Sequence, residues 1–379
     1  MKIKLTSVIY LLTFLVFFGF LGLENYLVLL LAAIIVLTGI KSCGLNKAFC
    51  VLALFLTLHT LIYLYNRSSL SLDWLAKNAL NPLILFFVGY WLAERSSDSK
   101  KPVMTLVLGF FIHAGINVVL YIRDPSSMTE RSFSNIWGGQ ITATLHNLLF
   151  VPVVALLFYA IYFCRSRLWK FLLIAASVIG IYGTVVSASR TLLYLIIIIF
   201  MINLVLNSLR RDMKKTKTYI TLFFLVFVLL VAYELDAFGI RSWVEASSLS
   251  ERFQGNVTES DSVLGNVRWD MTTKVIVALK DHPFGNITVV NYAHNLFLDM
   301  AKYTGIFPAL GIFLWCLVSV IRYISFTLKK ERNSWNIAVI GISIAFMTVF
   351  FLEPVLEGLP IIFSAFCYLC GIMTCQRRS

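Results

Sequence analysis

The stretch YTGIFPALGIFLWCLVSVIRYIS, residues 303–325, contains a single charged side chain, that of Arg322. An apolar run of this length matches the roughly 20 residues that a helix needs to cross the hydrocarbon core of a membrane. Similar runs recur along the chain, which is 59% apolar and only 13% charged. The composition therefore predicts an integral membrane protein built from helices.

About twelve apolar runs are predicted to be membrane-spanning helices. The first two are separated by only a few residues around Glu24, which indicates a tight helical hairpin. No small-residue cleavage site follows the first run, so we expect it to be retained as a helix. The predicted spans are residues 7–23, 26–41, 47–65, 79–93, 103–122, 142–163, 169–188, 191–208, 218–234, 303–325, 335–352 and 360–375.

The distribution of basic residues predicts the orientation of these helices. With the N-terminus in the cytoplasm, the cytoplasmic segments hold 21 of the 32 Lys and Arg residues, and the other side holds 15 of the 19 acidic residues. Cytoplasmic loops of membrane proteins are rich in Lys and Arg. We therefore expect both termini in the cytoplasm. The net charge of +13 is explained by this bias and does not indicate binding of nucleic acid.

One polar interval, residues 235–302, stands out between the ninth and tenth predicted helices. It predicts one large loop outside the cytoplasm that contains short helices, within a single integral membrane domain over residues 1–379. Inside it, residues 266–280 are predicted to form a helix that ends at Pro283 and Gly285. Its apolar residues recur at helical spacing of three and four: Leu264, Val267, Met271, Val275 and Leu279.

Arg190 lies where two predicted helices are joined with almost no loop, on the side opposite the cytoplasm. A charged side chain at a membrane boundary is costly unless it reaches the interface or finds a partner. Two interpretations stay open: an anchor that snorkels to the interface, or a fixed guanidinium for phosphate oxygens, whose geometry Arg matches with two parallel hydrogen bonds.

His294 lies at the end of the long loop, where the chain re-enters the membrane. An imidazole can take a proton from a hydroxyl group near neutral pH, or donate a hydrogen bond to phosphate or sugar. A structural role is the alternative, and we favour it for His282 in the turn before Pro283. The other histidines are spread along the chain, so the sequence predicts no metal site. Cys367 and Cys370 lie in an apolar run and are interpreted as packing residues.

Three segments carry a resemblance to a known family. They are Ser187–Leu192, Gly265–Trp269 leading into Asp281–Gly285, and Tyr292–Asp299 followed by Gly305–Pro308. Together with the position of the long loop, they make residues 130–375 resemble the superfamily of O-antigen polymerases and ligases. The resemblance implies an all-α, GT-C-like glycosyltransferase fold in the bacterial inner membrane, with a periplasmic active site, a lipid-linked oligosaccharide donor, and neither a metal nor another cofactor.

Two branches of this superfamily compete. Polymerases join repeat units on undecaprenyl pyrophosphate, whereas ligases transfer the finished chain to lipid A core. Residues 136–139, Ala143-Thr144, Asp299, Pro308 and residues 351–358 are more similar to polymerases, while the spacing from His294-Asn295 to Gly305 is typical of ligases. A transporter or flippase of lipid-linked sugars is a third reading, but transporters tend to carry mid-membrane charges and internal repeats.

The resemblance also implies roles for individual residues. Arg190 and Arg268 would bind the pyrophosphate and stabilise its charge as it leaves. His294 would be the base toward the acceptor hydroxyl or would position that hydroxyl, and Asp299 would orient His294. The implied partners are the undecaprenyl-pyrophosphate-linked oligosaccharide, membrane lipids and a chain-length regulator, without nucleic acid. Further substrate contacts are expected from Asn295, Glu353, Glu357 and Arg131, with the two glutamates as alternative bases.

Overall fold

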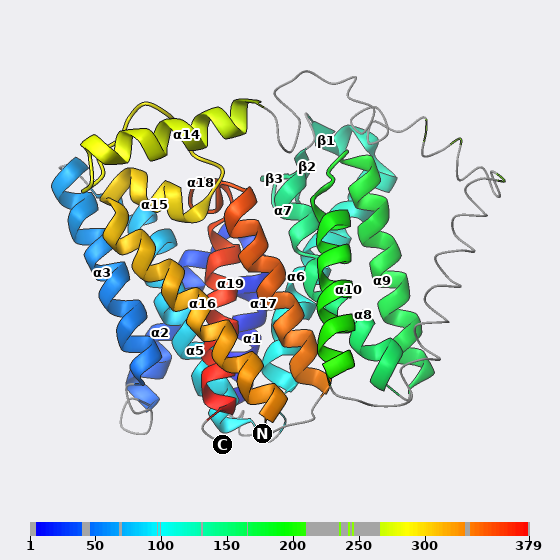
Figure 1. The fold of residues 1–379 in the computed structure, drawn as a ribbon. Helices are drawn as coiled ribbons and strands as arrows, with labels where there is room; N and C mark the ends of the chain where they lie inside the picture. The colour runs from blue at the N-terminus through cyan, green and yellow to red at the C-terminus, as the bar shows by residue number, and fades with distance from the viewer. Residues whose placement is uncertain are drawn as a thin grey trace. The chain divides into compact units, whose positions relative to one another are not determined.

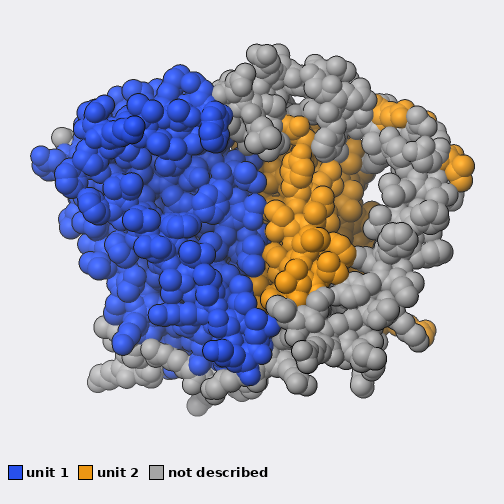
Figure 2. All heavy atoms as spheres, in the orientation of Figure 1, with its two compact units in different colours: residues 1–113, 266–331, 343–379 blue, residues 114–265, 332–342 orange. Residues whose placement is uncertain are grey.

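The computed structural model describes residues 5–39, 46–67, 70–96, 98, 100–129, 132–164, 166–209, 266–329 and 334–377, and positions 235, 242 and 245. The structure is mostly helical, as predicted (Figure 1). Two compact units can be distinguished, coloured separately in Figure 2: residues 1–113, 266–331 and 343–379 form unit 1, and residues 114–265 and 332–342 form unit 2. The assignment of the whole chain to one membrane domain stays a prediction.

Unit 1 contains both ends of the described chain and the C-terminal part of the long loop. α6 and α17 begin in one unit and end in the other. The helical elements of unit 1 are α1 (Leu5–Phe18), η1 (Phe20–Gly22), α2 (Glu24–Gly39), α3 (Lys47–Arg67), α4 (Leu72–Leu75), η2 (Ala76–Leu80), α5 (Asn81–Arg95), the first part of α6 (Lys100–Arg123), α14 (Asn266–Asp281), α15 (Leu296–Thr304), α16 (Ile306–Lys329), the second part of α17 (Ser334–Leu352), α18 (Val355–Gly358) and α19 (Pro360–Gln376).

Unit 2 combines helices with a small antiparallel sheet that the sequence analysis did not predict. The three strands follow one another in the order β1-β2-β3, and Phe133 of β2 lies opposite Ile141 of β3. Both side chains are buried. The elements of unit 2 are the end of α6, η3 (Pro125–Ser127), β1 (Met128–Thr129), β2 (Ser132–Ser134), β3 (Gln140–Thr142), α7 (Ala143–Leu148), α8 (Val151–Phe163), α9 (Arg167–Val186), α10 (Thr191–Leu209) and the start of α17.

Seven helical segments of the described residues are long and apolar enough to cross a membrane, and four shorter apolar helices accompany them. Each corresponds to one of the predicted spans, so the predicted apolar helices are confirmed, and their length and composition are consistent with a helical membrane protein. The ninth predicted span, residues 218–234, lies outside the described residues. The total of twelve spans and their orientation therefore stay predictions.

The core of unit 1 is the close packing of α5 against α19. A Cβ added to Gly371 would lie 2.0 Å from the carbonyl oxygen of Phe86, and one added to Gly89 would lie 2.2 Å from that of Tyr368. Only glycine lets the two backbones approach this closely, as in other membrane helix pairs. Cys367 and Cys370 on the same helix are fully buried, as expected for packing residues.

The two ends of the unit 1 bundle differ in character. α14, α15 and α18 lie at one end, here called the loop end, and the described chain begins and finishes at the other, the termini end (Figure 1). Lys47, Arg322 and Arg377 line one groove at the termini end. Near the loop end, Asn25 donates a hydrogen bond to Asp73 at 3.1 Å. The predicted orientation of the helices and the two-sided distribution of charge stay predictions.

One predicted boundary is wrong. The tenth span was expected to begin at Tyr303, but a separate short helix, α15, occupies residues 296–304 and α16 starts only at Ile306. Gly305 divides them with φ +82. A Cβ at this position would lie 2.2 Å from the carbonyl oxygen of Pro283, so the break requires glycine because the loop backbone passes directly against it.

Candidate functional site

The loop helix α14 covers the end of unit 1 where α15 begins. Its bounds, Asn266–Asp281, agree with the predicted helix. Val275 from the predicted apolar stripe is fully buried against Ile287 and Ala293, with Leu279 packed beside them. This small core fixes the segment after α14, including Ala293, the residue immediately before His294.

The turn after α14 is tied to the end of α15 by backbone hydrogen bonds. Ile306 N–H donates to Pro283 at 3.1 Å, and Ile287 N–H donates to Lys302 at 3.0 Å. Gly285 has φ +89, and a Cβ there would meet the backbone of Tyr303 and Thr304 at 2.5 Å. The Pro283-Phe284-Gly285 turn predicted from sequence therefore serves to dock the loop on α15.

His294 is half-buried and has φ +52, a conformation that few residues other than glycine adopt. It precedes α15, whose N-terminus is capped by Asn295: the side-chain oxygen of Asn295 accepts hydrogen bonds from Phe297 N–H at 2.9 Å and Leu298 N–H at 3.1 Å. The rings of His294 and Tyr292 meet edge to face at 4.7 Å between centroids. Asn295 was predicted to contact substrate. In the structure its side-chain oxygen caps the N-terminus of α15.

Asp299 supports His294 through the backbone. Its side chain is fully buried, and its Oδ1 accepts a hydrogen bond from Ala293 N–H at 2.6 Å. Its other oxygen, Oδ2, is buried without a hydrogen-bond partner among the described residues. Burial raises the pKa of Asp299 to about 7, against the lowering effect of the Ala293 bond and of Lys302. Asp299 was expected to orient the His294 side chain; what the structure shows is a bond to the adjacent peptide.

Lys302, one turn further along α15, is 2% exposed, which is rare for a lysine unless it is paired. Its Nζ donates to the carbonyl of Asn291 and lies 3.5 Å from Glu357 Oε1 of α18. The same carboxylate oxygen accepts a hydrogen bond from Tyr303 OH. Burial lowers the pKa of Lys302, and Glu357 opposes that shift. A charged network with a buried lysine and a half-exposed glutamate therefore joins α15 to α18.

Aromatic and basic side chains from α3 and α4 surround Tyr303. The rings of Tyr63 and Trp74 stack at 3.8 Å, and Tyr63 meets Tyr303 edge to face at 5.5 Å. The guanidinium of Arg67 lies over the Tyr303 ring at 5.5 Å. Asn66 donates hydrogen bonds to the carbonyls of Phe284 and Tyr303 at 2.9 and 2.8 Å. These contacts fix α15 on the membrane helices.

A groove of about 640 Å³ lies between α14 and residues 286–289. Its walls combine hydroxyl, amide and charged groups with four apolar residues, Val277, Ala278, Ile287 and Val289. Such a mixture can donate and accept hydrogen bonds and still offer apolar contact, as polar ligands require. The polar lining residues are Thr273, Lys274, Asp281, His282, Asn286 and Thr288.

Arg190 belongs to unit 2, where it precedes α10 in the four-residue connection from α9, as the sequence predicted. Ala188 in this turn has φ +50. Asn147 of α7 holds the turn by accepting a hydrogen bond from Thr184 at 3.2 Å and donating one to Ser187 at 3.3 Å. The backbone that carries Arg190 is therefore fixed by buried polar contacts.

The remaining predicted residues are placed as follows. Arg268 lies in the first turn of α14, and Arg131 lies outside the described residues. Glu353 is 7% exposed just after α17, and Glu357 belongs to the Lys302–Tyr303 network. In unit 1 the structure brings His294, Asn295, Asp299 and Glu357 to the loop end.

Sequence reasoning missed Lys302, Tyr303 and Arg67. A signal was present, because Asp299 and Lys302 are three residues apart in an otherwise apolar helix and therefore share a face. Tyr303 was overlooked because it was assigned to a membrane span. Within the described part of the chain, no group of three or more His, Cys, Asp or Glu side chains is arranged to hold a metal ion.

Comparison with known proteins yields no assignment. No model of a protein family matches this sequence, and no characterised protein matches it.

Proposed function

We propose that this membrane protein is an O-antigen polymerase. It joins undecaprenyl-pyrophosphate-linked oligosaccharide repeat units at the periplasmic face of the bacterial inner membrane by metal-independent glycosyl transfer. The proposal rests on the resemblance to that superfamily of five short segments, residues 187–192, 265–269, 281–285, 292–299 and 305–308. It requires a reactive group held at a membrane surface next to a place for the sugar acceptor.

The observation that best supports the proposal is that the backbone on both sides of His294 is held in place. Asp299 accepts a hydrogen bond from the N–H of Ala293, the residue before His294, and Asn295 caps the helix that follows. The apolar cluster around Val275 packs against Ala293 and so holds the loop. A base must be held precisely to be effective in proton transfer. A histidine fixed from both sides of its backbone, at the end of a bundle of membrane helices, meets that requirement.

In the proposed reaction, the acceptor hydroxyl oxygen attacks the anomeric carbon of the donor sugar. The new C–O bond forms as the bond from that carbon to the pyrophosphate oxygen breaks. His294 takes the proton of the hydroxyl, and the electron pair of the broken bond leaves with undecaprenyl pyrophosphate. Arg190 and Arg268 stabilise the charge that develops on the leaving group. The groove of about 640 Å³ beside α14 receives the acceptor sugars.

Two alternatives make different predictions. A ligase would share the His294-Asn295 and Gly305 spacing and would transfer finished chains to lipid A core. A transporter is favoured by one feature, the burial of two ionisable side chains, Asp299 and Lys302, on the same short helix, because buried ionisable groups in membrane proteins often serve proton relays. It would move lipid-linked sugar across the bilayer without lengthening it.

A strain that lacks the protein separates these functions. Loss of a polymerase leaves lipid A core carrying one repeat unit. Loss of a ligase leaves bare core and long chains on the lipid carrier, and loss of a flippase leaves bare core without periplasmic chains. Either of the last two results would refute the polymerase assignment.

A further inference from the structure

A groove at the termini end of unit 1 combines an apolar floor with positive charge. It lies between α3 and α16, reaches the end of α19, and has a volume of about 350 Å³. The floor is closed by Trp315, whose Nε1 donates to the carbonyl of Ala48 at 2.8 Å. Phe55 packs directly on Gly311, where an added Cβ would lie 2.2 Å from its ring. The groove is thus a fixed feature of two tightly packed helices.

Three cations from three elements line this groove: Lys47 at the start of α3, Arg322 near the end of α16, and Arg377 just after α19. None of its described lining residues carries a carboxylate, and the rest of the wall is apolar apart from Ser319. Lys47 and Arg322 are exposed. The groove is therefore positively charged. It lies where the apolar surface of the helices ends and polar chain begins.

This combination fits one class of occupant. An anionic phospholipid has a phosphodiester group, which Arg and Lys bind by charge-assisted hydrogen bonds. It also has acyl chains, which an apolar channel along membrane helices accepts, and basic pockets between such helices bind anionic head groups. We propose that the Lys47–Arg322–Arg377 groove is a binding site for an anionic phospholipid of the bilayer.

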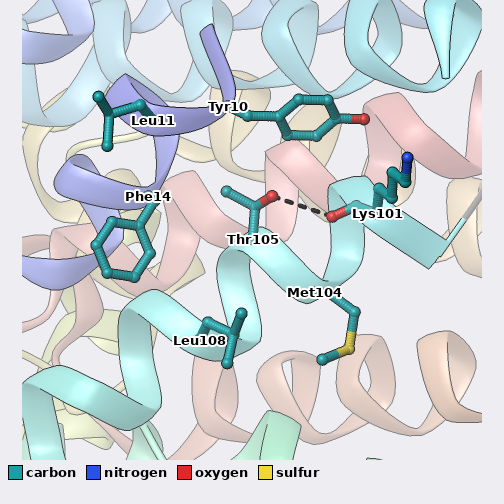
Figure 3. A pocket seen from close by; sticks show the side chains of 7 residues that line it. All are labelled: Tyr10, Leu11, Phe14, Lys101, Met104, Thr105 and Leu108. Carbon is teal, nitrogen blue, oxygen red and sulfur yellow. Dashed lines mark hydrogen bonds between the residues drawn. The ribbon is translucent and has the colours of Figure 1, made fainter. Parts of the chain in front are cut away.

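A second groove in the same unit provides an internal comparison. It lies between α1 and α6 and has nearly the same volume, about 360 Å³. Figure 3 shows its lining: Tyr10, Leu11 and Phe14 on one side, and Met104, Thr105 and Leu108 on the other. Lys101 is its single cation among the described residues. The two grooves thus have similar volumes and similar apolar walls, but they differ in the number of positive charges.

The experiment is native mass spectrometry of the full-length protein after exchange into bilayer nanodiscs of phosphatidylglycerol and phosphatidylcholine in equal amounts. The wild type should retain phosphatidylglycerol over phosphatidylcholine by about tenfold or more. The variant K47A/R322A/R377A should lose that preference. The control K100A/K101A/K329A removes three cations of α6 and α16 outside the groove and should keep it.

A third variant, Val318→Trp, fills the groove without changing its charge. It should also lose the bound lipid, because the acyl chains no longer fit. The proposal is overturned if the wild type shows no preference, if both triple variants lose it equally, or if Val318→Trp retains full binding, which would indicate charge attraction at the surface only.

Discussion

Asp299 Oδ1 accepts a hydrogen bond from the backbone N–H of Ala293 at 2.6 Å, and so a buried carboxyl group of α15 fixes the peptide that immediately precedes His294. The bond joins the last turn of the loop to the first turn of the helix. It makes the position of His294 depend on a side chain that is itself shielded from solvent.

The first prediction separates the acceptor oxygen of Asp299 from its charge. Asp299→Asn keeps an oxygen for Ala293 N–H, whereas Asp299→Ala leaves that buried donor unsatisfied, at a cost of about 1–3 kcal/mol. We expect the Asn variant to form polymer close to the wild-type amount and the Ala variant to lose most of it. The measurement is the length distribution of polysaccharide in cells with equal amounts of inserted protein. Equal loss in both variants would mean that the hydrogen bond to Ala293 is not what matters.

The second prediction concerns pH. The pKa of Asp299 is raised from 3.8 to about 7 by burial, so the folded protein binds this proton more tightly than the unfolded chain does. Its stabilising contribution is fully present below pH 3.8 and is lost as the pH rises through 7. The Tm of Asp299→Asn minus that of the wild type should therefore increase between pH 5 and pH 8. A constant difference across this range would contradict the raised pKa.

The third prediction concerns the Lys302–Glu357 pair. Glu357→Ala removes the carboxylate that lies nearest the buried ammonium and leaves it with the Asn291 carbonyl, the Tyr303 ring and the weaker attraction of Asp299. This loss should lower the free energy of unfolding by about 1–3 kcal/mol. Lys302→Met removes the buried charge itself, and the half-exposed Glu357 can still be hydrated, so this variant should be less affected. In a double-mutant cycle by thermal unfolding, the two changes should be non-additive. Strict additivity would show that the pair does not couple α15 to α18.

The fourth prediction tests the two arginines. Arg190→Ala and Arg268→Ala should each lower the rate of product formation about a hundredfold or more while the protein still inserts, since a transition-state contact to the leaving group is worth about 2–4 kcal/mol. Lysine at either position should retain only part of the activity, because its ammonium group lacks the planar pair of N–H donors with which a guanidinium binds phosphate. Lys280→Ala, an exposed charge on the same helix as Arg268, is the matched control. Normal polysaccharide ladders in both alanine variants would remove the pyrophosphate role.

The sequence predicted much of the fold because membrane helices and the amphipathic α14 depend on local composition and spacing. The cap at Asn295 and the turn at Gly285 could also be read from residue type. The division of the tenth span into α15 and α16 could not, because Gly305 breaks the helix where residues 283–284 pack against it. The Lys302–Glu357–Tyr303 network was missed for a related reason: it joins segments more than 50 residues apart, and only tertiary packing brings them together.

The fifth prediction concerns His294. His294→Ala should abolish polymer formation, and chelators should leave the wild type unaffected, because the proposed chemistry uses no metal. If the imidazole is the base, the rate should fall below about pH 6.5 as it becomes protonated. If it positions the acceptor, His294→Gln should retain substantial activity, and its rate should fall less steeply at low pH than that of the wild type. Reversible inactivation by EDTA would refute the metal-free mechanism.

The central claim is tested most directly by reconstitution. Purified protein in liposomes is supplied with undecaprenyl-pyrophosphate repeat units, with and without lipid A core, and the products are separated by size. The account predicts chains of increasing length on the lipid carrier without any need for core, and none with His294→Ala. Transfer to core without elongation, or passage of the lipid-linked unit across the bilayer with its length unchanged, would contradict it.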